Sequence, residues 1–283
     1  MSPFGGKVAV VTGAGSGIGR ALALGLARRG ARLALSDVDE AGLAETVGAA
    51  ERLGDEVHHQ RLDVADRDAW PAYADAVAAR FGVVHQVYNN AGIAFARTVL
   101  ESELSDYDRV LGINLWGVIL GTKAFLPHVI ASGDGHVVNV SSLNGIMAQG
   151  EMSHYVASKF GVRGFTETLR IEMAQAGHRV GVTSVHPGGI KTNIATRALS
   201  AARERGEEIT EEHLARERLY NEKLLKMSPD AAAEVILEGV EAGRPRVLVG
   251  NDAKLVDILV RALPARYVKG VLAFDKRLAS ARR

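Results

Sequence analysis

The chain has 283 residues, 47% hydrophobic and 24% charged, so it is long enough to bury a sizeable core in one large domain or two small ones. Its formal net charge is +1, which argues against the strongly basic surface that nucleic-acid partners require. It has no cysteine, which excludes disulfides, a thiol nucleophile and thiolate metal sites, and which fits a reducing, cytoplasmic location.

The N-terminal residues 1–13 contain a short apolar run that meets Gly13 directly. This segment lacks the length and the flanks of a secretory signal. No uncharged apolar stretch reaches the length that a membrane-spanning helix needs, so we expect a protein that does not cross a membrane.

Short β-branched runs alternate with helical stretches along the first two thirds of the chain. In chain order, we expect strands and the helices that follow them at 7–13 and 17–29, 31–37 and 39–53, 56–64 and 66–81, 83–92 and 105–131, and 136–142 and 152–176, with a sixth strand at 179–189. Strands that alternate with helices through short connections are typical of a parallel sheet with helices on both faces. The sequence therefore predicts an α/β fold, a doubly wound, three-layer α/β/α arrangement of the Rossmann type.

The alternation ends after Pro187. Residues 193–227 are highly charged, and we interpret them as a helical lid over the substrate, or else as a solvated helical pair that only packs. Ser228 and Pro229 are typical of an N-cap followed by proline at the first helical position, which predicts a helix over 229–242.

The end of the chain is apolar and basic together. A seventh strand is expected at 246–250, which closes a domain over residues 1–250. Residues 251–283 form a C-terminal helical extension with eight Lys and Arg against three Asp. We expect this extension to pack on its own domain or on a partner subunit, and contact with a membrane surface is the alternative.

A glycine-rich loop, TGAGSGIG (12–19), joins the first strand to the first helix. Backbone N–H groups of such a loop can approach a pyrophosphate, and the helix dipole favours its charge. Tight packing between strand and helix is the other use of such glycines. The residues expected to contact the pyrophosphate are Gly13, Ser16, Gly17, Ile18 and Gly19.

Two carboxylates end the next strands. Asp37 can accept hydrogen bonds from the adenosine ribose hydroxyls and would repel a 2′-phosphate, so NAD is expected rather than NADP. Asp63 and Val64 end the third strand and could reach the adenine. Each aspartate could instead cap the helix that follows it.

The stretch YVASK (155–159) places Tyr155 and Lys159 four positions apart, on one helix face. A free tyrosine titrates near ~10, so it is a poor base at neutral pH. An ammonium ~4 Å away favours the phenolate by about 4 kcal/mol at an effective dielectric of 20, which would tune the phenol for proton transfer. The alternative is a tyrosine and a lysine that only share a helix surface.

Several motifs in order resemble the short-chain dehydrogenase/reductase family over about residues 5–192. They are TGAGSGIG (12–19), NNAG (89–92), Asn114, Ser142, YVASK (155–159) and PGGIKT (187–192). The resemblance implies a catalytic set of Asn114, Ser142, Tyr155 and Lys159. It implies that Ser142 bonds the substrate oxygen, that Lys159 also holds the nicotinamide ribose, and that Asn114 holds a water linked to Lys159; an asparagine bonded to its own helix is the alternative.

The resemblance also implies further contacts to the cofactor. Asn90, Ala91 and Gly92 would lie beside it, although Asn-Asn-Ala-Gly is also a good turn. A second group, otherwise an ordinary loop, would lie near the nicotinamide, with Thr192 bonding its carboxamide: Pro187, Gly188, Ile190 and Thr192.

The expected function is reversible hydride transfer between NAD and a secondary alcohol or ketone, with Tyr155 as general acid and base and no metal. The alternatives are an NADP-dependent carbonyl reductase and a non-catalytic, nucleotide-binding regulatory protein. Apolar residues suggest an apolar substrate: Ile93, Phe95, Leu143, Met147 and Met152. The resemblance implies a homodimer or homotetramer. His154 and His186 flank motif residues and are expected to be satisfied loop histidines rather than pocket residues.

Overall fold

The structure of the protein is a computed structural model. It describes residues 3–54, 56–192 and 225–280 together with the isolated positions 196, 203, 210, 211, 214 and 218. Of residues 274–280 it describes the backbone alone. Most of the predicted lid, 193–227, therefore lies outside the described residues.

The core of the fold is a seven-stranded, all-parallel sheet with the order β3-β2-β1-β4-β5-β6-β7. Its strands are β1 (Val8–Thr12), β2 (Arg32–Asp37), β3 (Val57–Arg61), β4 (Gln86–Asn89), β5 (Gly135–Val140), β6 (Val180–Pro187) and β7 (Arg246–Val249). Six strands lie within segments predicted from the sequence, β5 begins one residue before its predicted segment, and the parallel sheet confirms the predicted fold class.

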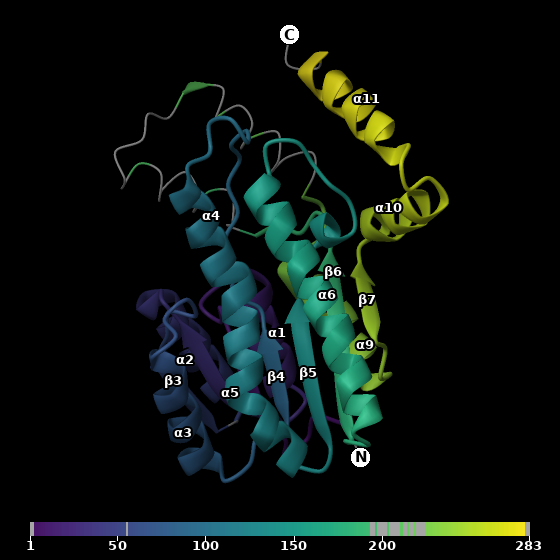
Figure 1. The fold of residues 1–283 in the computed structure, drawn as a ribbon. Coiled ribbons are helices and arrows are strands. Elements are labelled where there is room, and N and C mark those ends of the chain that lie inside the picture. Colours follow the sequence, from purple (N-terminus) through teal and green to yellow (C-terminus); the bar gives the residue numbers. More distant parts are fainter. Residues whose placement is uncertain are drawn as a thin grey trace.

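Helices cover both faces of the sheet (Figure 1). The first face carries α1 (Gly17–Ala27), α2 (Glu40–Glu51) and α9 (Pro229–Glu241), and the second carries α3 (Ala69–Phe81), α5 (Gly117–Ala131) and α6 (Ser153–Gln175). Outside these two layers lie α4 (Leu104–Leu111), a π-helical turn (Gly112–Trp116), a 3₁₀ turn (Leu143–Gly145), α10 (Asn251–Ala262) and α11 (Tyr267–Ser280).

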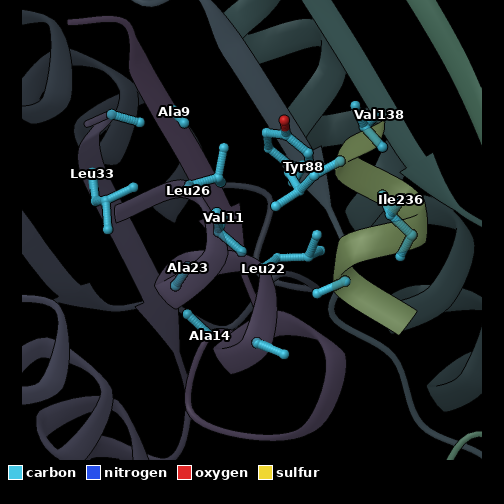
Figure 2. Packing of buried hydrophobic residues seen from close by; sticks show 14 of the residues in the cluster. Ala9, Val11, Ala14, Leu22, Ala23, Leu26, Leu33, Tyr88, Val138 and Ile236 are labelled. Atoms are coloured by element: carbon cyan, nitrogen blue, oxygen red, sulfur yellow. The ribbon is translucent and has the colours of Figure 1, made fainter. Parts of the chain in front are cut away.

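Strand β1 shows why the sheet is buried on both sides. Its side chains alternate between the two faces, so Ala9 and Val11 join the core under α1 and α9, whereas Val8 and Val10 join the core under α3 and α5. Figure 2 shows the first of these cores, to which Val11, Leu22 of α1 and Ile236 of α9 all contribute side chains. A run of five buried residues, four of them apolar, is typical of a central parallel strand.

The helix starts follow local capping chemistry. The Asp39 carboxylate accepts a hydrogen bond from Gly42 N and begins α2. Ser228 accepts from Ala231 N ahead of Pro229, which confirms the predicted cap of α9.

The predicted helix over 105–131 is α4, the π-helical turn and α5 in unbroken succession, Leu104–Ala131. By length and composition this helix could cross a membrane. Lys123 divides its apolar part, so no uncharged stretch of this helix reaches the length that a membrane-spanning helix needs. Its α5 part packs on β4, β5 and α3, as a core helix of the second layer does.

The strand order reverses at β1. The chain passes from β1 to β2 and β3 on one side, and then returns to place β4 on the other side. In open parallel sheets such a reversal leaves a crevice at the carboxyl ends of the strands, and ligands bind there. The loops after β1, β2, β4, β5 and β6 carry the residues predicted for the site.

Candidate active site

The glycine loop between β1 and α1 fits closely against the loop after β4. Gly13 and Gly17 have φ angles of +65° and +54°, which side chains rarely adopt. A Cβ atom at Gly13 would lie 2.8 Å from Ala91 Cα, and one at Gly19 would overlap the Gly13 carbonyl. The loop therefore leaves its backbone open to a ligand, at the start of a helix whose Ser16 side chain makes no capping hydrogen bond.

Asp37 holds this loop from the end of β2. Its carboxylate is 7% exposed, and it accepts hydrogen bonds from Gly15 N at 2.8 Å and from Asp39 N at 2.9 Å. Asp37 does not cap α2, because the capping residue is Asp39. Each carboxylate oxygen has a further lone pair, so both could still accept a ribose hydroxyl.

Arg20 is a site residue that the sequence reading missed. One guanidinium nitrogen donates to the carbonyls of Gly15 at 2.7 Å and Gly42 at 3.0 Å and to the Glu45 carboxylate at 2.8 Å. Its Nε donates to Thr46 Oγ1 at 3.0 Å. The arginine thus joins the glycine loop to α2, beside a surface depression of about 340 Å³. Nothing in the local sequence marks Arg20, because three of its four partners come from a different helix.

The NNAG segment is fastened to the glycine loop rather than standing free as a turn. Asn90 Nδ2 donates to the carbonyls of Thr12 at 3.0 Å and Gly13 at 3.3 Å. The Thr12 hydroxyl accepts from Asn90 N at 3.1 Å and Ala91 N at 3.2 Å. Asn90 and Ala91 therefore hold the glycine loop in shape through Thr12 and Gly13. Thr12 is a second site residue that the sequence reading missed.

Asp63 and Val64 follow β3 at the same edge of the sheet. Asp63 is exposed, and its carboxylate accepts from Ala65 N at 2.9 Å. It caps no helix, because α3 begins after Asp68. Val64 is 6% exposed, and its carbonyl accepts from Trp70 Nε1. The Val64 carbonyl is thus already bonded, and the adenine contact predicted for both residues stays a prediction.

Asn114 lies on the π-helical turn and is fully buried. Its Oδ1 accepts from Ile93 N at 2.8 Å, and its Nδ2 donates to Ile93 O at 2.9 Å and to Ser158 Oγ at 3.2 Å. The side chain therefore bonds two other segments and not its own helix. A Cβ atom at Gly92 would lie 3.2 Å from Asn114 Oδ1 and 3.4 Å from Lys159 Nζ, which places all three residues together.

Tyr155 and Lys159 share one face of α6, as their spacing predicts. Lys159 Nζ lies 5.7 Å from the centre of the Tyr155 ring, and it donates to the Val140 carbonyl, at the end of β5, at 3.0 Å. Lys159 is 3% exposed, and this burial lowers the pKa of its ammonium from 10.5 to about 8. At neutral pH the group is still charged, and two of its three protons remain for other acceptors.

Ser142 follows β5 two residues after the carbonyl that holds Lys159. It is 8% exposed, and its hydroxyl accepts from Asn144 N at 3.1 Å. Ser141 points elsewhere and donates to the Lys159 carbonyl at 2.8 Å, as strand alternation predicts.

His186 supports Ser142 from the neighbouring strand β6. Its Nδ1 donates to the Ser142 carbonyl at 3.0 Å, so its Nε2 accepts from Ser184 Oγ at 3.0 Å. Burial lowers the pKa of His186 to about 4, and the ring is neutral at physiological pH. Both ring nitrogens of His186 are hydrogen-bonded, as expected, although the residue lies in a strand and not in a loop.

His154 differs from the expectation. It lies in α6 next to Tyr155 and is fully buried, and neither ring nitrogen has a hydrogen-bond partner among the described residues. Its ring contacts that of Phe95 at 4.3 Å between centres, with the two ring planes tilted by 42°. The sequence could not show this, because the ring that covers His154 comes from the segment that Asn114 holds.

The PGGIKT segment leaves β6 and crosses the glycine loop. Gly188 N donates to Val249 O at 2.9 Å, and a Cβ atom at Gly17 would lie 3.2 Å from Thr192 Cγ2. Ile190 is 4% exposed and belongs to the core, so its side chain serves packing. Thr192 thus lies beside the glycine loop, and Pro187 is the last residue of β6, while the contacts to the nicotinamide stay predictions.

A carboxylate from α10 fixes this segment. Asp252 accepts from Gly189 N at 2.7 Å, and a Cβ atom at Gly188 would collide with the same carboxylate. Asp252 is a third residue that the sequence reading missed. No local signal could have found it, because the two partners are far apart in the chain.

The described part of the chain holds no cluster of three or more His, Asp or Glu side chains that could bind a metal ion. The features that lie at the carboxyl end of the sheet are instead a glycine loop, the Asp37 carboxylate, the buried Lys159, and the hydroxyl side chains of Tyr155 and Ser142. This set fits a dinucleotide together with a hydroxyl or carbonyl substrate.

Comparison with known proteins agrees with this geometry. The family model of the short chain dehydrogenases matches residues 7–203. The chain belongs to the short-chain dehydrogenase/reductase family. It is an oxidoreductase of that family, with the Rossmann-type fold.

Individual relatives cover nearly the whole chain. A Mycobacterium tuberculosis protein named as an oxidoreductase, SadH, is 55% identical over 273 residues, 96% of each chain. A 3-alpha-(or 20-beta)-hydroxysteroid dehydrogenase of the same species is 36% identical over 188 residues, 66% of this chain and 70% of that protein. A solved family member from Burkholderia phymatum in complex with NAD superposes with a TM-score of 0.85 at 34% identity, over 93% of this chain and 95% of that one.

Proposed function

We propose that the protein catalyses reversible hydride transfer between NAD and an apolar secondary alcohol or ketone. The observation that carries this proposal is the position of Lys159, a buried ammonium fixed by the Val140 carbonyl and 5.7 Å from the Tyr155 ring. Burial of this charged group costs folding stability, so its presence here indicates a function. That function is to favour the ionised form of the adjacent Tyr155 phenol.

The chain's own residues handle the proton. In the oxidative direction the Tyr155 phenolate takes the proton of the substrate hydroxyl, and in the reverse direction Tyr155 protonates the carbonyl oxygen. Lys159 stabilises the phenolate by its charge. The Ser142 hydroxyl, held by Asn144 N and by the backbone bond to His186, donates to the substrate oxygen. When bound, the nicotinamide accepts or returns the hydride.

The choice of NAD rests on Asp37. Its carboxylate lies beside Gly15 at the end of β2, and Asp39 and Glu45 line the adjacent depression. These three negative charges would repel a 2′-phosphate. Arg20 is the basic side chain at this depression, and it is already committed to two carbonyls and to Glu45. Both features support NAD over NADP.

An apolar substrate is supported by two neighbouring segments. Arg97 N donates to Glu151 O at 2.7 Å, which lays residues 93–97 beside residues 147–152. Five half-buried apolar side chains occur on these segments and on the adjoining turn: Ile93, Phe95, Leu143, Met147 and Met152. The hydroxysteroid dehydrogenase among the relatives acts, by its name, on a substrate of this kind.

The test is a screen of secondary alcohols of increasing apolar size with NAD⁺ and with NADP⁺, followed by the absorbance of the reduced nicotinamide. We expect turnover with NAD⁺. The variant Tyr155→Phe should lower turnover by roughly 10²–10⁴-fold and leave NADH binding, read by fluorescence, nearly unchanged. Full turnover in Tyr155→Phe would refute the assigned role.

A further inference from the structure

The helices α10 and α11 leave the domain at its β7 edge, and one face of α10 is firmly attached there. Ala253 is fully buried, and the Asp257 carboxylate accepts from both terminal nitrogens of Arg246, on β7, at 2.6 and 2.9 Å. These contacts fix which way the helix is turned. The opposite face of α10 therefore points away from the sheet.

That outer face is apolar, although it is open to water. Ile258 is 66% exposed, the exposed residues Leu255 and Leu259 lie on the same helical stripe, and Leu263, also exposed, follows the helix. On α11, Val268 and Leu272 are also exposed. We call these six residues the α10–α11 face. A surface helix normally turns polar residues outward, so a patch of this kind indicates a contact surface.

The charges around the α10–α11 face are positive. Four exposed basic residues lie among its apolar residues: Lys254, Arg261, Arg266 and Lys269. The two carboxylates of the described side chains in this segment are engaged elsewhere, since Asp257 bonds Arg246 and Arg261, and Asp252 bonds Gly189 N. Apart from Arg261, which has Asp257 as its partner, the cations of this face have no matching anion among the described residues.

The start of α11 contacts the segment that joins Ser142 to Tyr155. Tyr267, the first residue of α11, accepts a hydrogen bond through its hydroxyl from Ala148 N at 3.2 Å, and Ala148 belongs to the segment between Ser142 and Tyr155. Figure 1 shows both helices at the carboxyl end of the sheet, with α11 projecting beyond the domain.

We propose that the α10–α11 face binds a lipid surface with anionic headgroups. The leucine and isoleucine side chains enter the interface, and the four cations meet the headgroups, as in other basic amphipathic segments that lie on membranes. A second copy of this chain fits less well. A symmetric pair would bring the same cations together on both partners and would leave them without counter-charges. This proposal concerns binding alone and does not rest on the proposed hydride transfer.

The test is co-sedimentation of the intact protein with vesicles of neutral phosphatidylcholine or of phosphatidylcholine mixed with phosphatidylserine. We expect recovery with the anionic vesicles, and less recovery as salt rises from 0.1 to 0.5 M. The double variant Lys254→Gln/Lys269→Gln should lower the partition coefficient about 30-fold. The double variant Ile258→Gln/Leu272→Gln should lower it at least ~10-fold.

Matched controls change the same side chains elsewhere on the surface. Arg52→Gln/Lys123→Gln removes the same net charge from α5 and the end of α2, and Leu53→Gln removes an exposed leucine near the opposite end of the sheet. Neither should change recovery. The proposal is overturned if anionic vesicles fail to recover the intact chain, or if the charge control acts as strongly as Lys254→Gln/Lys269→Gln. It is also overturned if Ile258→Gln/Leu272→Gln changes only the molar mass by light scattering, since the face would then join copies of the chain.

Discussion

The carboxamide of Asn114 pairs with both backbone groups of Ile93, accepting from its N–H at 2.8 Å and donating to its carbonyl at 2.9 Å. A third bond, to Ser158 Oγ, ties the pair to α6. One side chain thus holds the segment after β4 against the helix that carries Tyr155. Asn114 lies in the π-helical turn, and such irregular turns are frequent at functional sites.

Asn114→Ala should destabilise the protein by about 1–3 kcal/mol, because it leaves the N–H and the carbonyl of Ile93 without partners. Urea unfolding measures this change. NADH titration of the folded variant should also show weaker binding, since Gly92 is next to the freed segment. A loss below about 0.5 kcal/mol would mean that the pairing contributes little to stability.

Lys159→Met should stabilise the protein at neutral pH. The pKa of Lys159 falls from 10.5 in the unfolded chain to about 8 in the fold, so the unfolded chain binds this proton more tightly. The stability cost of burying the charged ammonium is complete below pH ~8 and disappears as pH rises toward ~10.5. It amounts to about 3 kcal/mol, from which the lost bond to Val140 O subtracts about 1 kcal/mol.

The measurement for Lys159→Met is urea unfolding of both proteins at pH 7 and at pH 10.5. We expect the variant to gain about 2 kcal/mol at pH 7 and to lose up to about 1 kcal/mol at pH 10.5, where mainly the lost bond to Val140 O remains. If the two proteins differ in free energy of unfolding by the same amount at both pH values, the titration of Lys159 is not the source of the difference.

Asp37→Asn should shift cofactor preference toward NADP. The substitution removes the negative charge that opposes a 2′-phosphate but keeps an oxygen that can accept from Gly15 N. We expect the ratio of NADPH to NADH affinity to rise by about tenfold, which corresponds to ~1.4 kcal/mol. Fluorescence titration with both reduced cofactors measures the ratio. The control Asp66→Asn removes an exposed carboxylate from the loop before α3, and it should leave the ratio unchanged.

His154→Leu should reduce the dependence of stability on pH. Burial lowers the pKa of His154 below 6.5, so the unfolded chain takes up this proton first as pH falls, and the folded state loses stability below pH ~6.5. Leucine has no such proton. The stability difference between the variant and the parent should therefore move in favour of the variant from pH 7 to pH 5.

Comparing pH 7 with pH 5 separates titration from packing, since any cavity cost of His154→Leu is the same at both. Four other buried or half-buried histidines with lowered pKa values cancel in the difference: His58, His85, His136 and His186. If the difference does not change with pH, the pKa of His154 is the same in the folded and the unfolded chain, and burial does not lower it.

The sequence alone determined the sheet and the identity of most of the site. Alternating apolar runs and helices specify a parallel sheet, because strands buried on both faces read as continuous β-branched runs, as in Val8–Thr12. The spacing of Tyr155 and Lys159 and the glycines of residues 12–19 are local patterns, so they can be recognised without any tertiary contact. The resemblance to a family supplied the order of the remaining motifs.

Only the tertiary structure decided which residues hold that site in shape. Arg20, Thr12 and Asp252 act on partners from other elements, and no local pattern records such pairs. The same reason applies to Lys159, whose lowered pKa follows from burial by surrounding segments. It applies as well to α10, where one face is fixed by Arg246 and the other is left exposed. Residue types and spacing are written along the chain, whereas burial and long-range hydrogen bonds exist only after the segments have packed.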